Sequence, residues 1–158
     1  VLGGGMSSRL FHKVREELGA AYYVRADSDL MLDHGYFAVS AGVDHGKIEA
    51  VVKAILEEMK RLTKELVPAA ELQKSKDHMI GNFILGLESS DELGSFYGGQ
   101  EIVTKKILSP NEIIEKVKKV KAEEIREVAK FIFQNSKLNL AVIGPYKDKE
   151  GFKKILRF

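Results

Sequence analysis

The first 22 residues carry the pattern that most constrains how this chain folds. The chain opens on a glycine-rich segment that contains Gly3, Gly4 and Gly5. Ser7 or Ser8 then follows as a candidate cap for a helix N-terminus. Apolar side chains recur at helical spacing at Leu10, Phe11, Val14 and Leu18. Gly19 supplies the left-handed conformation with which many helices end, so the segment predicts a short amphipathic helix that stops at a glycine.

Alternating apolar and polar residues predict a β-hairpin directly after this helix. The predicted first strand, Tyr22–Leu32, gathers on its apolar face Tyr22, Val24, Ala26, Leu30 and Leu32. A turn at Asp33–Gly35 leads into a returning antiparallel strand, Tyr36–Val43. Much later in the chain, Leu138–Ile143 is a short continuous apolar run, which is typical of a buried strand.

The rest of the chain predicts helices. Asp44 is a candidate cap for the first of them, and Ser109–Glu112 has the serine, proline and glutamate of a strong helix start. The expected helices cover roughly residues 45–62, 68–87, 89–103, 110–119, 122–132 and 150–156. The third has a weak or irregular end because it contains three glycines.

These elements predict an α+β fold with a mostly antiparallel sheet and helices packed on one face. The 158 residues fit a single domain, 1–158. Three strands are few for so many helices. We therefore expect one or more N-terminal strands to lie upstream of Val1 or to be supplied by a partner. A start on valine, directly in a glycine-rich segment, is interpreted as a cut from a longer polypeptide.

Composition excludes several classes of function. A formal net charge of +2 with both signs interspersed gives no electrostatic case for binding nucleic acid or a membrane surface. The densest basic cluster, Lys118, Lys119 and Lys121, is followed at once by acids and is interpreted as a solvated helix face. There is no cysteine and no apolar run long enough to span a membrane, so a soluble, cytoplasmic protein is expected.

Arg15 and Tyr22 are the leading candidates for chemistry. They flank the turn through Gly19, so both side chains can reach one spot near the helix C-terminus and the strand start. A phenol donates a neutral hydrogen bond and a guanidinium is a permanent cation, a combination that suits a peptide carbonyl gaining negative charge. The alternative is structural: a core tyrosine, and an arginine favourably placed at a helix C-terminus.

The order of these features resembles the C-terminal half-unit of the pitrilysin/insulinase family of zinc peptidases, in its processing-peptidase-like branch. The resemblance is carried by the glycine-rich segment, the Ser8-Arg9-Leu10-Phe11 helix, and the arginine followed seven residues later by a tyrosine. It extends to the Ser109 helix start and to a terminal Val142–Pro145 segment. It implies that Arg15 and Tyr22 bind peptide substrate and stabilise the tetrahedral intermediate. It also implies that Gly3, Gly4 and Gly5 belong to a loop of the substrate chamber.

The metal site of that family is missing from this sequence. The family binds zinc through H-x-x-E-H on a helix with a distal glutamate, whereas here the histidines are scattered at His12, His34, His45 and His78. His45 and Glu49 are four residues apart, but such a pair is more often a surface contact. The acids around the hairpin turn, Asp27, Asp29 and Asp33, are explained by alternation and turn preference. We therefore expect no metal in this chain and zinc in a catalytic N-terminal partner half.

Two further patterns are weaker. The glycine-rich segment before a helix suggests a phosphate cradle, but it has neither the lysine nor the spacing of a nucleotide-binding loop. Phe96 and Tyr97 could line a cavity, although helix packing is the default.

The sequence thus predicts a half-unit that closes a peptide chamber in partnership with an N-terminal catalytic half. That half is in the same polypeptide or in another subunit, and this chain alone is predicted to be inactive. The alternative is a catalytically inactive partner or scaffold domain with the same ancestry.

Overall fold

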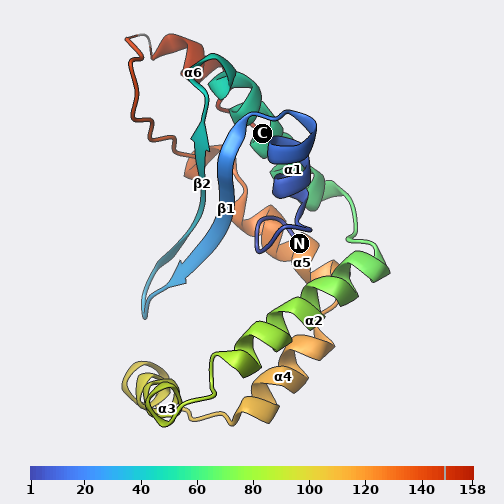
Figure 1. Cartoon of the computed structure of the whole chain (residues 1–158), viewed down its shortest axis with the longest axis vertical. Helices are drawn as coiled ribbons and strands as arrows, with labels where there is room; N and C mark the ends of the chain where they lie inside the picture. Colours follow the sequence, from blue (N-terminus) through green and yellow to red (C-terminus); the bar gives the residue numbers. More distant parts are fainter. Residues whose placement is uncertain (148) are drawn as a thin grey trace.

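The computed structural model describes residues 1–147 and 149–158. In chain order its elements are η1 (Phe11–Glu17), β1 (Ala21–Leu30), β2 (Gly35–Val43), η2 (His45–Lys47), α1 (Ile48–Lys64), α2 (Ala69–Leu85), α3 (Ser90–Thr104), α4 (Pro110–Lys119), α5 (Ala122–Ile132), η3 (Asn135–Lys137) and α6 (Glu150–Ile155). Figure 1 shows a body built around the β1–β2 hairpin and α1, from which α2, α3 and α4 extend as an arm. The α+β class and the antiparallel pairing are as predicted.

A β-bulge distinguishes the hairpin from the predicted one. Ala21 pairs with Val43 and Tyr23 pairs with Gly42, so Tyr22 is an extra residue with no partner opposite it. The bulge lets Ala21 and Val24 both pack against the core, although they are three residues apart. The prediction that Tyr22 lies on the apolar face with Val24 was therefore wrong, because simple alternation does not survive an inserted residue.

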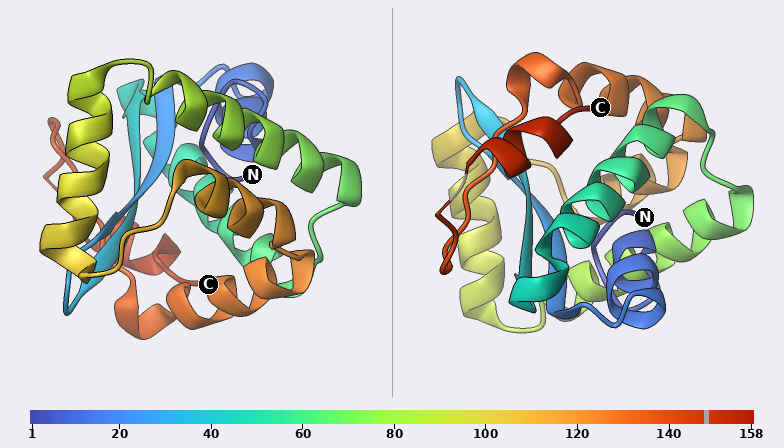
Figure 2. Two further views of the ribbon diagram at one scale, coloured as in Figure 1. Left: turned by 90° about the horizontal axis from the view of Figure 1, so that it is seen from below. Right: turned by 90° about the horizontal axis from the view of Figure 1, so that it is seen from above.

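The core lies between the hairpin and α1. The α1 helix buries a stripe at Val51, Val52, Leu56, Met59 and Leu62, the spacing expected of a helix that covers a sheet face. A second, smaller cluster joins Val14 of η1 to Ala20 and Val51. Figure 2 shows η1, α1 and α5 against the same face of the hairpin. The helical layer thus positions η1, and with it the start of β1.

The arm has a different character from the body. None of α2, α3 and α4 contains a fully buried residue. Capping boxes at Ser89 and Ser109 begin α3 and α4, and the latter start was predicted. Despite its three glycines α3 is continuous, and Lys105 with a φ of 55° ends it. A perpendicular contact between Phe83 and Phe96, with ring centroids 5.6 Å apart, ties α3 to α2.

The predicted buried strand at residues 138–143 does not form within the part of the chain that the structure describes. No regular element covers these residues. Leu140 is 37% exposed and Ile143 is fully exposed. An apolar run becomes a strand only when a neighbouring strand satisfies its backbone groups. In the described residues the sheet consists of β1 and β2, and residues 138–143 pair with the outer edge of neither. The sequence pattern of residues 138–143 is typical of a strand, but no strand of the described structure pairs with this segment.

Candidate functional site

The glycine-rich segment lies against β1. The amide of Ala26 donates a hydrogen bond to the carbonyl oxygen of Gly3, at 3.3 Å. A Cβ at position 3 would lie 2.5 Å from both the amide nitrogen and the Cβ of Ala26, whereas at Gly4 it would meet nothing within 4 Å. Glycine is therefore needed at position 3 for close approach to the strand, and Gly4 needs another explanation.

Two side chains from α2 hold the same segment from its other side. Nε2 of His78 lies 3.1 Å from the carbonyl oxygen of Gly4 and 3.0 Å from the side-chain amide of Asn82. A Cβ at Gly5 would lie 3.1 Å from Nε2. A neutral imidazole nitrogen either donates or accepts, so Nε2 donates to Gly4 only when Asn82 presents its oxygen. The loop is thus fixed between β1 and α2.

An ion pair strengthens the link to α2. Arg9 donates two hydrogen bonds to the carboxylate of Glu71, from Nε at 2.7 Å and from one terminal nitrogen at 2.8 Å. The Arg9 side chain is 12% exposed and that of Glu71 is 27% exposed. The hydrogen bonds from Arg9 lower the pKa of the Glu71 carboxyl, and the same bonds raise the pKa of Arg9. The glycine-rich segment and the start of the helix that follows it are therefore both attached to α2.

The start of the first helix shows why neither the predicted serine cap nor a phosphate cradle forms. The amides of Ser8, Arg9 and Leu10 donate to the carbonyl oxygens of Gly5, Val1 and Leu2, respectively. η1 has no side-chain cap, and the prediction of capping by Ser7 or Ser8 was wrong. Helix N-termini bind phosphate through free N–H groups. Here the folded-back chain uses these donors itself.

Arg15 lies in the last turn of η1, where the sequence placed it. This helix is a π-helix, and the amides of Leu18 and Ala20 reach back to the carbonyl oxygens of Lys13 and Val14. π-helical turns are rare and occur often at functional sites. The Arg15 side chain is exposed, and its guanidinium carbon lies 4.9 Å from the centroid of the Phe11 ring. The cation is therefore partly ordered by an aromatic face and accessible to solvent.

Tyr22 projects away from the protein. Its side chain is 87% exposed because the bulge removes it from the packed face. Gly19 has a φ of +52°, as predicted, and makes the turn that separates Tyr22 from Arg15. Neither a hydrogen bond nor a ring contact joins Arg15 to Tyr22. The alternative of a core tyrosine is wrong, and both side chains present unused hydrogen-bonding capacity on the surface.

The histidines each have a partner that explains them without a metal. His12 pairs with Glu16, His34 with Asp33, and His78 with the Gly4 carbonyl. The remaining one, His45, lies 3.2 Å from the hydroxyl of Tyr146 through Nδ1. Over residues 1–147 and 149–158 no group of three or more His, Cys, Asp or Glu side chains could hold a metal ion. His45 and Glu49 instead line an open hollow of about 600 Å³ with Phe152.

Comparison with known proteins identifies the family. The model of the peptidase M16 inactive domain matches residues 1–79, which include the glycine-rich segment, Arg15, Tyr22 and His78. The chain belongs to the peptidase M16 inactive-domain family. The resemblance to the pitrilysin/insulinase zinc peptidases is thereby confirmed, and the matching model describes an inactive domain.

Bacterial relatives align with nearly the whole chain. An uncharacterized zinc protease of Rickettsia bellii is 36% identical over 149 residues, which are 92% of this chain and 35% of the relative. An uncharacterized zinc protease of Bacillus subtilis is 33% identical over 145 residues, again 92% of this chain and 35% of the relative. The chain therefore spans about a third of the length of the relatives that it matches.

Solved structures have the same fold. A conserved protein from Enterococcus faecalis matches with a TM-score of 0.71 and 28% identity, over 81% of this chain and 30% of that one. A protease from Helicobacter pylori matches with a TM-score of 0.75 and 23% identity, over 87% of this chain and 33% of that one. The second likeness is one of fold alone.

Sequence analysis missed the α2 side chains that hold the glycine-rich segment. His78 and Asn82 are four residues apart and so share a helix face, but nothing local indicates what that face meets. The same holds for Glu71, which bonds to a residue 62 positions earlier.

Among the described residues no helix has both the length and the apolarity needed to cross a membrane.

Proposed function

We propose that this M16 domain is the non-zinc-binding half of a zinc-dependent endopeptidase. In this role it closes the peptide chamber against an N-terminal catalytic half and presents Arg15 and Tyr22 to the substrate. The proposal is supported by the family match over residues 1–79, a range that includes both residues. Their exposure on either side of the Gly19 turn supports it, because a ligand can reach both.

The chemistry divides between the two halves. When bound in the catalytic half, zinc polarises the scissile carbonyl and lowers the pKa of water for attack. On this side the Tyr22 hydroxyl donates a hydrogen bond to the carbonyl oxygen as negative charge develops there. The Arg15 guanidinium adds a fixed positive charge. The glycine-rich segment, held by β1 and His78, forms a wall of the chamber.

Substitution of Tyr22 in the assembled enzyme tests this assignment. Removal of one donor to a developing oxyanion typically costs about 100- to 1,000-fold in turnover, so Tyr22→Phe should lower kcat by at least about tenfold. Tyr23→Phe is the matched control, because the Tyr23 ring lies over Gly42 and needs no hydroxyl there. Equal activity of the two variants, with normal folding, removes Tyr22 from the mechanism.

The same experiment addresses the alternative role as an inactive scaffold. If the domain is a scaffold, Arg15→Gln and Tyr22→Phe both leave its fold and its partner binding intact. Neither variant then changes the rate of peptide hydrolysis. A search of the joined or neighbouring half for H-x-x-E-H separates the two cases independently. Absence of that motif from both places favours the scaffold.

We also propose that a further strand completes the sheet. The described residues provide a two-stranded sheet, which by itself is marginal in water. The apolar segment at residues 138–143 has no ladder partner, and Ile143 is fully exposed. A strand from upstream sequence or from a partner would satisfy these groups. Slower amide exchange over residues 35–43 and 138–143 on joining the catalytic half is the expected result, and unchanged exchange contradicts it.

A further inference from the structure

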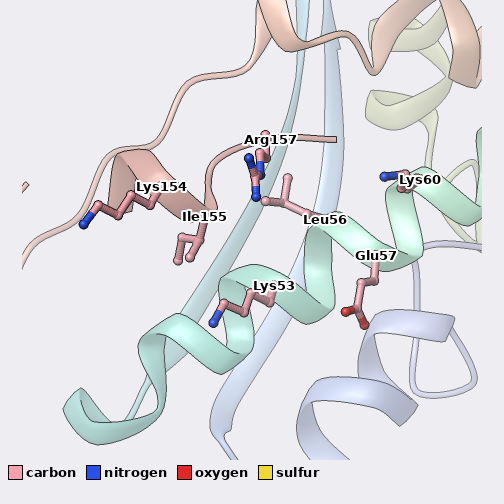
Figure 3. Close-up of a pocket in the computed structure, with 7 residues that line it drawn as sticks. All are labelled: Lys53, Leu56, Glu57, Lys60, Lys154, Ile155 and Arg157. Carbon is pink, nitrogen blue, oxygen red and sulfur yellow. The ribbon is translucent and has the colours of Figure 1, made fainter. Parts of the chain in front are cut away.

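A basic hollow lies on the side of α1 that meets the C-terminal segment. Its volume is about 360 Å³, within the range of small-molecule sites. Figure 3 shows its two walls: α1 on one side, and α6 with the residues after it on the other. The lining residues are Lys53, Leu56, Glu57, Lys60, Lys154, Ile155 and Arg157.

The charges of this hollow are not balanced. Four of its seven lining residues are cationic and one is acidic. The single carboxylate, on Glu57, points toward η1 in Figure 3. The hydrogen bond that Lys13 donates to Glu17 is the largest cause of the raised pKa of Lys13, and the charge of Glu57 adds a smaller contribution. The Glu57 carboxylate therefore lies on the η1 side of the hollow.

Some basic side chains elsewhere in the chain are paired. Lys13, Lys118, Lys130 and Lys153 each bond to a glutamate three or four residues away. Within the described ranges, no ion pair or side-chain hydrogen bond involves Lys53, Lys60, Lys154 or Arg157. The contrast is sharpest in α6, where Lys153 is paired and the adjacent Lys154 is not. Like charges brought together without acids repel one another, unless an anion joins them.

The spacing of the cations indicates the kind of anion. Lys53 and Lys60 are seven residues apart, so their Cα atoms are separated by about 10 Å along the helix. An anion with several charged groups along its length, such as a chain of linked phosphates, can contact lysines so spaced without drawing their side chains together. Lysine is a common phosphate ligand, and arginine adds a forked donor from the opposite wall. Leu56 and Ile155 add an apolar part to the lining.

We propose that this hollow binds a small oligophosphate, with Lys53 and Lys60 on one side of the anion and Arg157 on the other. Lys154, which extends outward at the rim in Figure 3, adds a more distant charge. The bound anion joins the C-terminal segment to α1. The site is independent of Arg15 and Tyr22, so its test does not depend on peptide hydrolysis.

Calorimetric titration of the chain with inorganic triphosphate, at about 150 mM salt to screen diffuse attraction, tests the proposal. The expected result is saturable binding, accompanied by a higher Tm. The triple variant Lys53→Gln, Lys60→Gln, Arg157→Gln should bind at least about tenfold more weakly, because it loses the charges on both walls. A parallel titration with adenosine triphosphate distinguishes the sources: tighter binding indicates a nucleotide, and equal binding indicates the phosphate chain alone.

A control with the same change in net charge makes the test specific. Lys116, Lys118 and Lys119 lie on α4, outside the hollow, and their replacement by glutamine also removes three positive charges. This variant should keep the affinity of the original chain. Circular dichroism confirms that both triple variants fold. Three results overturn the proposal: no saturable binding, equal weakening in the two variants, or tighter binding of an acidic peptide than of triphosphate.

Discussion

The ion pair between Arg9 and Glu71 provides the most direct test of how the glycine-rich segment is held. The change is Glu71→Gln, which keeps the shape of the side chain and removes its charge. Two hydrogen bonds to a charged group would each contribute about 1.5–3 kcal/mol if fully buried. Both side chains are partly exposed, which reduces their worth. We therefore expect a loss of about 2 kcal/mol at pH 7, equivalent to about 4–8 °C in Tm for a chain of this size.

The pH dependence of this loss has a definite sign. The pKa of the Glu71 carboxyl is lowered in the folded state, first by the hydrogen bonds from Arg9, from its ordinary value of 4.5. The stabilisation is therefore fully present above pH 4.5 and is lost as the pH falls through the lowered folded pKa. The gap between the original chain and Glu71→Gln should close in that acidic range.

Urea unfolding followed by circular dichroism, at pH 7 and at several values below 4.5, measures both effects. Glu17→Gln is the matched control, because Glu17 makes a single bond to Lys13 on an exposed helix surface. A loss at pH 7 no larger than that of the control would refute the view that the Arg9–Glu71 pair fixes this segment. A loss that stays constant with pH would refute the electrostatic explanation.

Three further predictions use unfolding measurements or amide exchange. Gly3→Ala should lower the free energy of unfolding by about 1–3 kcal/mol, because its Cβ would collide with Ala26. The Cβ of Gly4→Ala would meet nothing within 4 Å, so this variant should lose far less. Equal losses in the two variants would contradict the close approach of Gly3 to Ala26. Gly19→Ala should lower the free energy of unfolding by about 1 kcal/mol, because residue 19 has a positive φ. Gly81→Ala, inside α2, should raise it by about 0.5–1 kcal/mol. A stabilising Gly19→Ala together with a destabilising Gly81→Ala would contradict this backbone. Ser109→Ala should cost about 1 kcal/mol by removing the α4 cap, a result checked by faster amide exchange in its first turn.

Sequence reasoning succeeded where neighbouring residues decide the structure. The period of α1, the capping box at Ser109 and the left-handed Gly19 all follow from interactions within a few positions. The family pattern across residues 3–22 belongs to the same group, because it is a run of local elements in fixed order. Even there, a single bulge moved Tyr22 from the packed face to the solvent.

What only the tertiary structure decided depends on residues far apart in the chain. The bond between Arg9 and Glu71 spans 62 positions, and the contact between Gly4 and His78 spans 74. The absence of a strand at residues 138–143 and the gathering of Lys53, Lys60 and Arg157 are equally non-local. By itself the sequence determined the short-range elements and the family, since periodicity, caps and turns are properties of adjacent residues. Which surfaces met, and which charges were left without partners, was decided by packing, because helices of the same pattern can dock in many ways.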